Sequence, residues 1–290
     1  MTSELRFDGR VAIVTGAGGG IGREYALLLG ARGAQVVVND VSAAAAAAVA
    51  GEVQAAGGSA IANIDSVSTP EGGQSIVAAA VDAYGTVDIL INNAGILRDQ
   101  SFHNLTPDNL DAVLDVHLRG AFFVTMPAYR IMRAKKYGRI VNTSSNSGLI
   151  GNFGQSNYGA AKMGIIGLTR VLAIEGQRNG IHVNAIAPAA RTRMTEALID
   201  AETAAALDPA YVAPAVAWLA HEDCPTTGEF ISAGAGRVAR YFIGLTPGYF
   251  DRDLTAEEVR DHWDEVRSTE GFIIPSSPSE EMDLIMAHWK

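Results

Sequence analysis

The sequence contains one cysteine, Cys224, and no apolar run long enough to cross a lipid bilayer. A single cysteine can form no internal disulfide and has no partner at the spacing of a metal site, so no bound metal is expected. The first residues include Glu4, Arg6 and Asp8 where a secretion signal requires an apolar stretch. These absences favour a cytoplasmic protein that neither spans a membrane nor is exported, with Cys224 as a bystander thiol.

Positive charge is also scarce, because 22 lysines and arginines face 32 aspartates and glutamates, which gives a net charge of −10 at pH 7. Nucleic-acid binding requires clustered lysine and arginine, and no basic stripe is present. We therefore expect a small-molecule substrate and no nucleic-acid partner. The 290 residues, of which 48% are hydrophobic, suffice for one α/β domain with an appended segment.

Short β-type runs alternate with helical stretches along most of the chain. The predicted strands are 10–15, 35–39, 59–64, 87–92, 138–143 and 182–187, and the predicted helices are 21–32, 43–56, 69–84, 106–133 and 158–179. This alternation predicts an α/β fold with a Rossmann-like, doubly wound parallel sheet. Ligands of such sheets bind at the carboxyl ends of the strands.

The pattern changes at about residue 240, where several prolines surround one charged helical stretch over 255–266. We expect residues 1–239 to form a single dinucleotide-binding catalytic domain. Residues 240–290 are too polar and too often interrupted by proline to form a core of their own. We expect this extension to lie over the substrate cleft or on a neighbouring subunit.

A glycine-rich turn joins the first predicted strand to the first predicted helix. Gly16, Gly20 and Gly22 would let the backbone approach a pyrophosphate, and Ile21 lies in the same turn. The free N–H groups of the following helix favour negative charge at this point. The turn therefore predicts a dinucleotide-binding site.

Acidic and hydroxyl side chains end the next two predicted strands. Asp40 lies 24 residues after Gly16, where a carboxylate can accept hydrogen bonds from the adenine ribose and repel a 2′-phosphate. No lysine or arginine lies between Gly16 and Ile21 or directly after Asp40, so NAD is favoured over NADP as the cofactor. Asp65 and Ser66 end the third strand, where they can meet the adenine edge.

A second glycine-containing turn, Asn92-Asn-Ala-Gly95, ends the fourth predicted strand. The small residues Ala94 and Gly95 would allow a cofactor to approach closely. Asn92 and Asn93 can tie neighbouring strand ends together. We therefore expect Asn93, Ala94 and Gly95 to border the cofactor.

Ser145, Tyr158 and Lys162 are the candidate catalytic residues. Lys162 follows Tyr158 by four residues, so the two share a helix face and the ammonium can approach the phenol. A nearby cation favours the phenolate form, which could take the proton of a secondary alcohol or return it during ketone reduction. Ser145, thirteen residues before Tyr158, could hydrogen-bond the same substrate oxygen.

These motifs, in this order over about residues 8–236, resemble the short-chain dehydrogenase/reductase family. The resemblance implies that Lys162 also contacts the nicotinamide ribose and that Pro188, after the sixth strand, borders the nicotinamide. Ala189 stands where the family usually has glycine. His117 takes the place of an asparagine that many members use in a proton relay; we expect a structural histidine, and a catalytic role stays open.

Further stretches are similar to the (3R)-hydroxyacyl-CoA dehydrogenase branch of this family; they are 36–40, 92–98, 116–120, 137–140, 151–155, 172–176 and 186–188. The similarity implies an NAD-linked enzyme of lipid metabolism that acts on a 3-hydroxyacyl-CoA, a steroid-derived acyl-CoA or a hydroxysteroid. The alternative enzyme is a reductase of 3-oxoacyl carrier protein or another ketone, which would favour NADPH and is opposed by Asp40. A dinucleotide-binding regulator is the non-enzyme alternative, which the intact catalytic set disfavours.

Two predicted helices, 106–133 and the one with Tyr158 and Lys162, carry apolar residues on more than one face. One face covers the sheet, and the other requires a partner. We expect a homodimer or homotetramer built through these helices, as the family resemblance also implies. The apolar residues are Val113, Val116, Phe122 and Phe123 in one helix and Met163, Ile165, Ile166, Leu168 and Val171 in the other.

Overall fold

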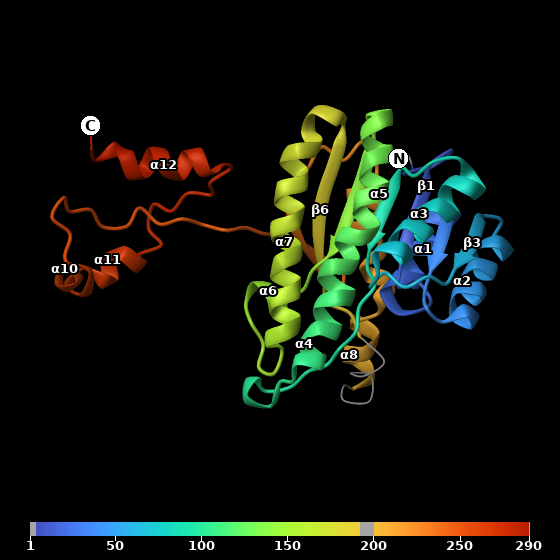
Figure 1. The fold of residues 1–290 in the computed structure, drawn as a ribbon, viewed down its shortest axis with the longest axis horizontal. Helices are drawn as coiled ribbons and strands as arrows, with labels where there is room; N and C mark the ends of the chain where they lie inside the picture. Colours follow the sequence, from blue (N-terminus) through green and yellow to red (C-terminus); the bar gives the residue numbers. More distant parts are fainter. Residues whose placement is uncertain (1–3, 192–199, 290) are drawn as a thin grey trace. The chain divides into compact units, whose positions relative to one another are not determined.

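The computed structural model describes residues 4–191 and 200–289. The chain forms two compact units, residues 1–240 and residues 241–290. The first unit is a sheet with helices on both of its faces (Figure 1).

Eight strands form one sheet in the order β3-β2-β1-β4-β5-β6-β7-β8. The strands are β1 Val11–Thr15, β2 Gln35–Asn39, β3 Ser59–Asn63, β4 Ile89–Asn92, β5 Gly138–Thr143, β6 Ile181–Pro188, β7 Phe230–Gly234 and β8 Arg237–Tyr241. All pairs from β3 to β7 are parallel, which confirms the predicted doubly wound sheet. The strand order reverses between β1 and β4, the place where such sheets bind ligands.

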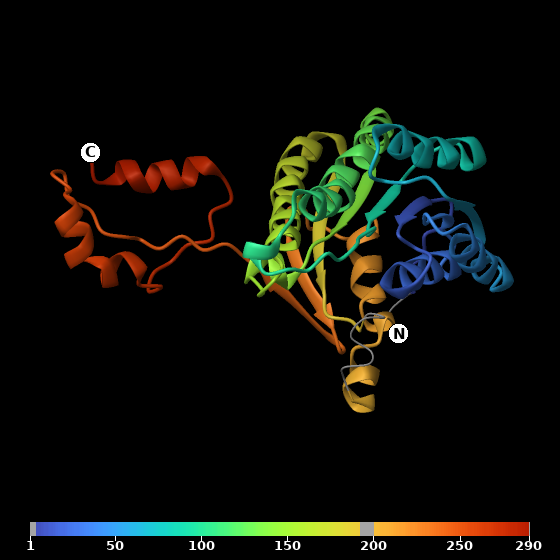
Figure 2. The ribbon, with the colours of Figure 1, turned by 60° about the horizontal axis from the view of Figure 1, so that its bottom comes forward.

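Two helix layers bury the sheet on both faces, which is why its strands read as apolar runs. One layer contains α1 Gly20–Ala31, α2 Ala43–Ala55 and α9 Ala213–Ala220, and the other contains α3 Pro70–Tyr84, α5 Gly120–Lys135 and α7 Ser156–Gly176. Figure 2 shows helices on both sides of the sheet, and each layer has its own hydrophobic core against the sheet. The ends of the parallel strands are therefore held between two rigid layers.

Local sequence sets the ends of α3. The Thr69 hydroxyl accepts a hydrogen bond from Gly72 N at 3.1 Å, and Pro70 occupies the first helical position. Gly85 ends the helix in the left-handed region, at φ +82°. The helix predicted over 69–84 is confirmed to within one residue.

The helix predicted over 106–133 is wrong in one respect, because the structure divides it. A π-helical turn, Asp115–Arg119, separates α4 Pro107–Leu114 from α5. The wider turn brings His117 to 5% exposure. Apolar spacing of three and four residues does not show where a helix widens to i→i+5 bonding.

Strands β7 and β8, and helix α9 before them, were not expected from the sequence. Strands β7 and β8 are joined by Ala235 and Gly236 at φ 49° and 75°, both in the left-handed region. Such a two-residue connection is a hairpin turn whose twist suits adjacent strands. The short helices α6 Asn146–Leu149 and α8 Ala201–Ala206 lie in connections between larger elements.

The second unit contains three short helices, α10 Ala256–Asp261, α11 Trp263–Arg267 and α12 Pro278–Ala287. The helical stretch predicted over 255–266 is broken at His262. None of the described residues 241–289 is buried within the chain. Across the described parts of the protein, no helix combines the length and apolar character that crossing a membrane requires.

Candidate active site

The predicted site residues lie at the carboxyl ends of the parallel strands. Gly16 follows β1, Asp40 follows β2, and Asp65 follows β3 by two residues. Asn93, Ala94 and Gly95 follow β4, Ser145 follows β5, and Pro188 ends β6. The fold therefore gathers residues from six separate strands along one edge of the sheet.

The glycine turn packs directly against the turn after β4, so side chains are excluded there. A Cβ on Gly16, at φ +63°, would lie 2.7 Å from the Ala94 Cα. A Cβ on Gly22 would lie 2.4 Å from the Gly16 oxygen. Gly20, at φ +55°, begins α1 without a side-chain cap, which leaves N–H groups of the first turn without side-chain partners.

Asp40 is held at the mouth of the glycine turn by backbone donors. Its Oδ2 accepts a hydrogen bond from Gly18 N at 3.0 Å, and its Oδ1 accepts one from Ser42 N at 2.9 Å. Arg23, the first cation after the turn, pairs with Glu52 and Glu24. In the described part of the chain, the Asp40 carboxylate forms no ion pair and is held by these two backbone donors.

Asp65 is oriented by a group of polar side chains. Its Oδ2 accepts hydrogen bonds from Asn63 Nδ2 at 2.8 Å and from the Ser75 hydroxyl at 2.6 Å. Asn39 Nδ2 donates to the Asp65 backbone oxygen at 2.9 Å. The Ser66 hydroxyl lies 2.8 Å from that of Ser68 and accepts from its N–H, so Ser66 also shapes the start of α3.

Asn92 and Asn93 tie neighbouring strand ends together, which confirms that prediction. Asn93 Nδ2 donates to the Thr15 oxygen at 3.0 Å and to the Gly16 oxygen at 3.1 Å. Asn92 Nδ2 donates to Asn142 Oδ1 on β5 at 2.8 Å. The sequence interpretation missed Thr15, whose Oγ1 accepts from the N–H groups of Asn93 and Ala94.

Ser145, Tyr158 and Lys162 come from the segment after β5 and the first turns of α7. The Ser145 hydroxyl caps α6 by accepting from Ser147 N at 3.1 Å. Lys162 Nζ donates to the Thr143 backbone oxygen at 2.6 Å and lies 5.5 Å from the centre of the Tyr158 ring. The three candidate catalytic side chains therefore belong to one small region of the sheet edge.

Burial dominates the protonation of this set. Lys162 is 3% exposed, and loss of hydration lowers its pKa from 10.5 to about 7. Burial raises the pKa of Tyr158, and a hydrogen bond with Ser145 opposes that rise. In the protein alone, burial therefore outweighs the hydrogen bond that favours the phenolate. The phenolate expected beside Lys162 and a positively charged nicotinamide stays a prediction.

His117 contacts the backbone and also faces a small cavity beside Lys162. Its Nε2 lies 3.0 Å from Ile96 N and 2.7 Å from the Ile96 oxygen, as expected for a structural role. Its ring meets the Tyr158 ring edge-on, with centres 5.1 Å apart. Burial, with Lys162 nearby, lowers the His117 pKa to about 3, so the imidazole is neutral at neutral pH.

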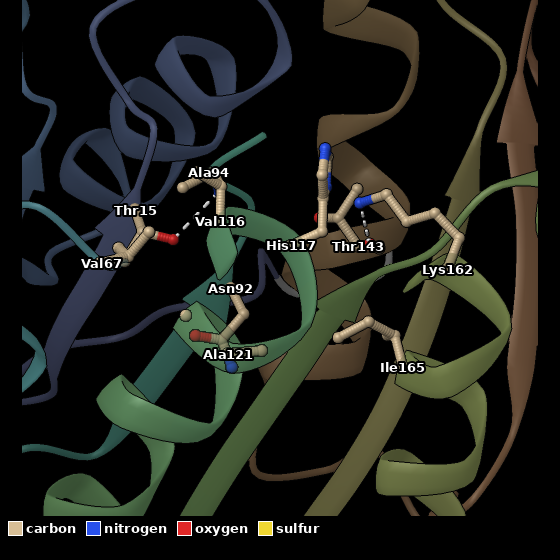
Figure 3. Close-up of a pocket in the computed structure, with 11 residues that line it drawn as sticks. Thr15, Val67, Asn92, Ala94, Val116, His117, Ala121, Thr143, Lys162 and Ile165 are labelled. Atoms are coloured by element: carbon tan, nitrogen blue, oxygen red, sulfur yellow. Dashed lines mark hydrogen bonds between the residues drawn. The ribbon is translucent and has the colours of Figure 1, made fainter. Parts of the chain in front are cut away.

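The cavity is lined by polar groups from β1, β4, β5, the π-helical turn and α7. Figure 3 shows the Lys162 ammonium directed at Thr143 with the His117 ring beside it. Among the described residues, His117 Nδ1 and Thr143 Oγ1 have no hydrogen-bond partner although both atoms are buried. Gly95 is needed at the rim, since a Cβ there would lie 2.4 Å from His117 Cε1.

The end of β6 accommodates an alanine at position 189, where glycine is usual in the family that the sequence resembles. Ala189 N donates to the Ala233 oxygen at 2.8 Å, which extends the pairing with β7 beyond Pro188. A Cβ on Gly234 would lie 2.2 Å from the Ala189 oxygen. The position that excludes a side chain is therefore Gly234 on the neighbouring strand.

Comparison with known proteins gives long matches. The profile of a family described as short chain dehydrogenase matches residues 10–203. The chain is 48% identical over 279 residues to the peroxisomal multifunctional enzyme type 2 of Mus musculus, which covers 92% of this chain and 38% of that protein. It is 43% identical over 279 residues to the peroxisomal hydratase-dehydrogenase-epimerase of Saccharomyces cerevisiae, covering 92% and 31%. The chain spans less than half of each of these two relatives.

Solved structures share the fold. Full-length peroxisomal multifunctional enzyme type 2 from Drosophila melanogaster matches with a TM-score of 0.86 and 40% identity, over 98% of this chain and 50% of that chain. A short chain dehydrogenase from Mycobacterium avium matches with a TM-score of 0.82 and 40% identity, over 90% and 97%. The same arrangement thus occurs within longer chains and in a chain of similar length.

Proposed function

The chain belongs to the short-chain dehydrogenase family, and we propose that it uses NAD to oxidise the 3-hydroxyl of a hydroxyacyl-CoA or of a steroid-derived substrate. Its class is that of an oxidoreductase that interconverts a secondary alcohol and a ketone. The observation that carries the proposal is the grouping of Ser145, Tyr158 and Lys162 beside the glycine turn. The name of the yeast relative, hydratase-dehydrogenase-epimerase, supports a dehydrogenase reaction. The acyl-CoA substrate is proposed from the similar stretches of sequence.

The residues at the sheet edge fit a nicotinamide dinucleotide. Gly16 and Gly22 leave a backbone surface that added Cβ atoms would fill, and Asp40 offers a carboxylate beside it. The pyrophosphate would be held by Gly16, Gly20, Ile21 and Gly22. The adenine ribose would be bound by Asp40, and the adenine would be bordered by Asp65 and Ser66. The nicotinamide half would be bordered by Asn93, Ala94, Gly95, Tyr158, Lys162 and Pro188. When bound, the dinucleotide supplies the acceptor for the hydrogen and electron pair that leave the alcohol carbon.

The chain's own residues handle the alcohol oxygen. Ser145 would donate a hydrogen bond to that oxygen and fix the carbon in place. Tyr158, as phenolate, would accept the hydroxyl proton on Oη while the carbon–oxygen double bond forms. Burial and the Asp99 charge raise the Tyr158 pKa, so with Ser145 bound to the substrate oxygen the phenolate would depend on the Lys162 cation, which lies 5.5 Å from the ring centre.

Preference for NAD over NADP is proposed from charge. A 2′-phosphate would lie against the Asp40 carboxylate, and the nearby Arg23 is already paired with Glu52 and Glu24. The measurement is a titration of both cofactors at equal ionic strength. Tighter binding of NADP would contradict the proposal and favour the 3-oxoacyl carrier protein reductase instead.

A substrate panel tests the reaction. NADH formation would be followed with (3R)- and (3S)-3-hydroxyacyl-CoA thioesters and with hydroxysteroids, and NADPH oxidation with 3-oxoacyl carrier protein. Turnover of the thioesters with NAD is expected. Dinucleotide binding without turnover of any member would favour the regulator.

Assembly through α5 and α7 is proposed from their outer faces. A groove of about 530 Å³ lies between the two helices. Phe122 is 41% exposed, Met126 45% and Val171 52% along it. Such an apolar surface suits a second copy related by twofold symmetry, which gives a dimer or, with a further interface, a tetramer. Light scattering would contradict this assembly by finding only a monomer of 30.4 kDa.

The role of residues 240–290 and the cellular location of the protein are also proposals. Residues 240–290 expose large apolar side chains, among them Trp263, Met282 and Trp289, and we propose that they cover the substrate cleft or a neighbouring subunit. Crosslinking from Trp263→Cys, with the native Cys224 replaced, would distinguish these sites. Cytoplasmic residence, expected from the single cysteine, stays a prediction, whereas the mouse and yeast relatives are named as peroxisomal.

A further inference from the structure

Lys162 is held at two points by the segment that leads to Ser145. Its Nζ donates to the Thr143 oxygen at 2.6 Å, and its backbone oxygen accepts from the Ser144 hydroxyl at 2.8 Å. Thr143 and Ser144 are consecutive, and Ser144 is 1% exposed. The segment at the end of β5 therefore contacts both the ammonium group and the backbone carbonyl of Lys162.

The Ser144 contact is additional to what helix formation requires. The Lys162 carbonyl lies inside α7, Ser156–Gly176, where helical geometry already supplies a donor one turn later. A carbonyl oxygen has two lone pairs, so the Ser144 hydroxyl uses the second one. The contact thus sets where α7 lies along the strand, and it is not needed to satisfy the carbonyl.

A second contact between the same elements repeats this pattern. Asn142 Nδ2 donates to the Thr169 hydroxyl at 3.0 Å, and both residues are fully buried. Asn142 precedes Ser144 by two strand positions, and Thr169 follows Lys162 by two helical turns, so both contacts lie on matching faces. Two points of attachment fix both the position and the rotation of α7.

The Asn142 amide is itself oriented from β4. Asn92 Nδ2 donates to Asn142 Oδ1 at 2.8 Å and to Thr125 Oγ1 on α5 at 2.9 Å. With its oxygen engaged by Asn92, the Asn142 amide nitrogen must face Thr169. The buried chain Thr125, Asn92, Asn142, Thr169 therefore joins α5 to α7 through the sheet.

We propose that Ser144 and Asn142 are positioning residues that set the register of α7 on β5 and thereby the place of Tyr158 and Lys162 relative to Ser145. They act through the position of α7. Because Tyr158 and Lys162 both lie on α7, a register error would move both away from the Ser145 hydroxyl while leaving the glycine turn intact. The role in catalysis rests on the proposed alcohol chemistry, whereas the effect on Tyr158 does not.

The test is the titration of Tyr158, read as phenolate absorbance in the difference between the parent and Tyr158→Phe. The same difference is measured in the Ser144→Ala background. Without the hydroxyl, the Tyr158 midpoint should rise by about half a pH unit, because the Ser145 hydroxyl, whose hydrogen bond lowers the Tyr158 pKa, is less well placed. Ser144→Thr keeps the hydroxyl and should restore the midpoint. The other titratable groups that act on this pair, His117 and Asp99, stay unchanged.

Kinetics give the second readout. Ser144→Ala should lower kcat about tenfold with the KM for NAD within about twofold, since the dinucleotide surface is untouched. Thr169→Val, which keeps the volume but removes the acceptor of Asn142, should shift the Tyr158 midpoint in the same direction. Ile76→Val, on the fully buried face of α3, serves as the stability control and should leave the midpoint in place.

An unchanged Tyr158 midpoint in folded Ser144→Ala would overturn the proposal, whatever happens to stability. If Thr169→Val does not fold, Ser144→Ala decides alone. If no substrate is turned over by the parent protein but the midpoint still shifts, the proposed function fails and the positioning role stands.

Discussion

The two edges of the parallel sheet hold buried polar groups in opposite states. At the amino edge, the Asp88 carboxylate is 2% exposed, accepts from Val11 N at 2.9 Å and pairs with Lys135 and, at 3.5 Å, with Arg10. At the carboxyl edge, Lys162 is buried with one backbone acceptor and no carboxylate among its described contacts. The first arrangement stabilises the fold, and the second stores the charge that the proposed chemistry needs.

This contrast has a physical reason. A buried charge that is paired and hydrogen-bonded can contribute to stability, whereas an unpaired one is destabilised and shifts its pKa. Groups with shifted pKa values are those that move protons near neutral pH. Removing a charged group at the amino edge should therefore lower the stability of the protein. Removing Lys162 at the carboxyl edge should raise stability and abolish activity.

The largest effect is expected at the amino edge. Asp88→Ala leaves Val11 N and the Lys135 ammonium without their acceptor and should lower the free energy of unfolding by about 3 kcal/mol. Asp88→Asn keeps an acceptor for Val11 N and should cost less. Both are measured by denaturant unfolding. A stability equal to the parent's would contradict the role given to this edge.

Tyr158→Phe should give the largest loss of activity. It removes the proton-accepting oxygen and keeps the ring, so turnover should fall by at least about 100-fold, with folding and NAD affinity retained. Steady-state kinetics and circular dichroism check both parts. Unchanged turnover would remove Tyr158 from the mechanism.

Lys162→Met should abolish activity and yet stabilise the protein. The folded-state pKa of about 7 lies below the ordinary 10.5, so the unfolded chain binds more protons between these values and stability rises with pH across that window. Replacing the lysine should raise stability by about 2 kcal/mol at pH 6, with a gain that shrinks toward pH 10. The matched substitution Lys135→Met should destabilise instead. Changes of stability with the same sign in Lys162→Met and Lys135→Met would contradict the comparison.

Asp40→Ala should weaken NAD binding by about tenfold, because one charged hydrogen-bond acceptor for the ribose is lost. The preference for NAD over NADP should narrow at the same time, since the repulsion of a 2′-phosphate disappears. Calorimetric titration with both cofactors measures the two effects. An unchanged ratio of affinities would show that another group selects the cofactor.

The smallest effect is expected in the β7–β8 hairpin. Ala235 adopts φ 49°, a left-handed conformation that costs a residue with a Cβ about 1 kcal/mol. Ala235→Gly should raise stability by roughly that amount, whereas Gly236→Ala should lower it. Thermal unfolding measures both. A loss of stability in Ala235→Gly would show that the turn is not strained.

Much of the fold could be predicted because the decisive signals are local. Buried parallel strands such as Gln35–Asn39 and Gly138–Thr143 read directly as apolar runs between turns. The hairpin strand Phe230–Gly234 has the length of Gln35–Asn39 but ends in Ser232, Ala233 and Gly234, so it has no such apolar run. The π-helical turn at Asp115–Arg119 buries His117, and residue spacing does not record where a helix widens.

The site divides in the same way. Gly16, Asp40, Tyr158 and Lys162 are recognisable because their residue types and spacing match the proposed chemistry. Thr143 binds Lys162 through its backbone oxygen, so no residue type could have indicated it. The direction of the Tyr158 pKa shift depends on burial, a property of the folded chain and not of the helical pair.

NADH formation with (3R)-3-hydroxyacyl-CoA, compared between the parent protein and Tyr158→Phe, is the most direct test of the proposed dehydrogenase function. The parent should reduce NAD and prefer it to NADP, and the variant should retain NAD binding while losing at least about 99% of turnover. Absence of NADH formation by a folded, NAD-binding parent, or equal rates in the two proteins, would contradict the proposal.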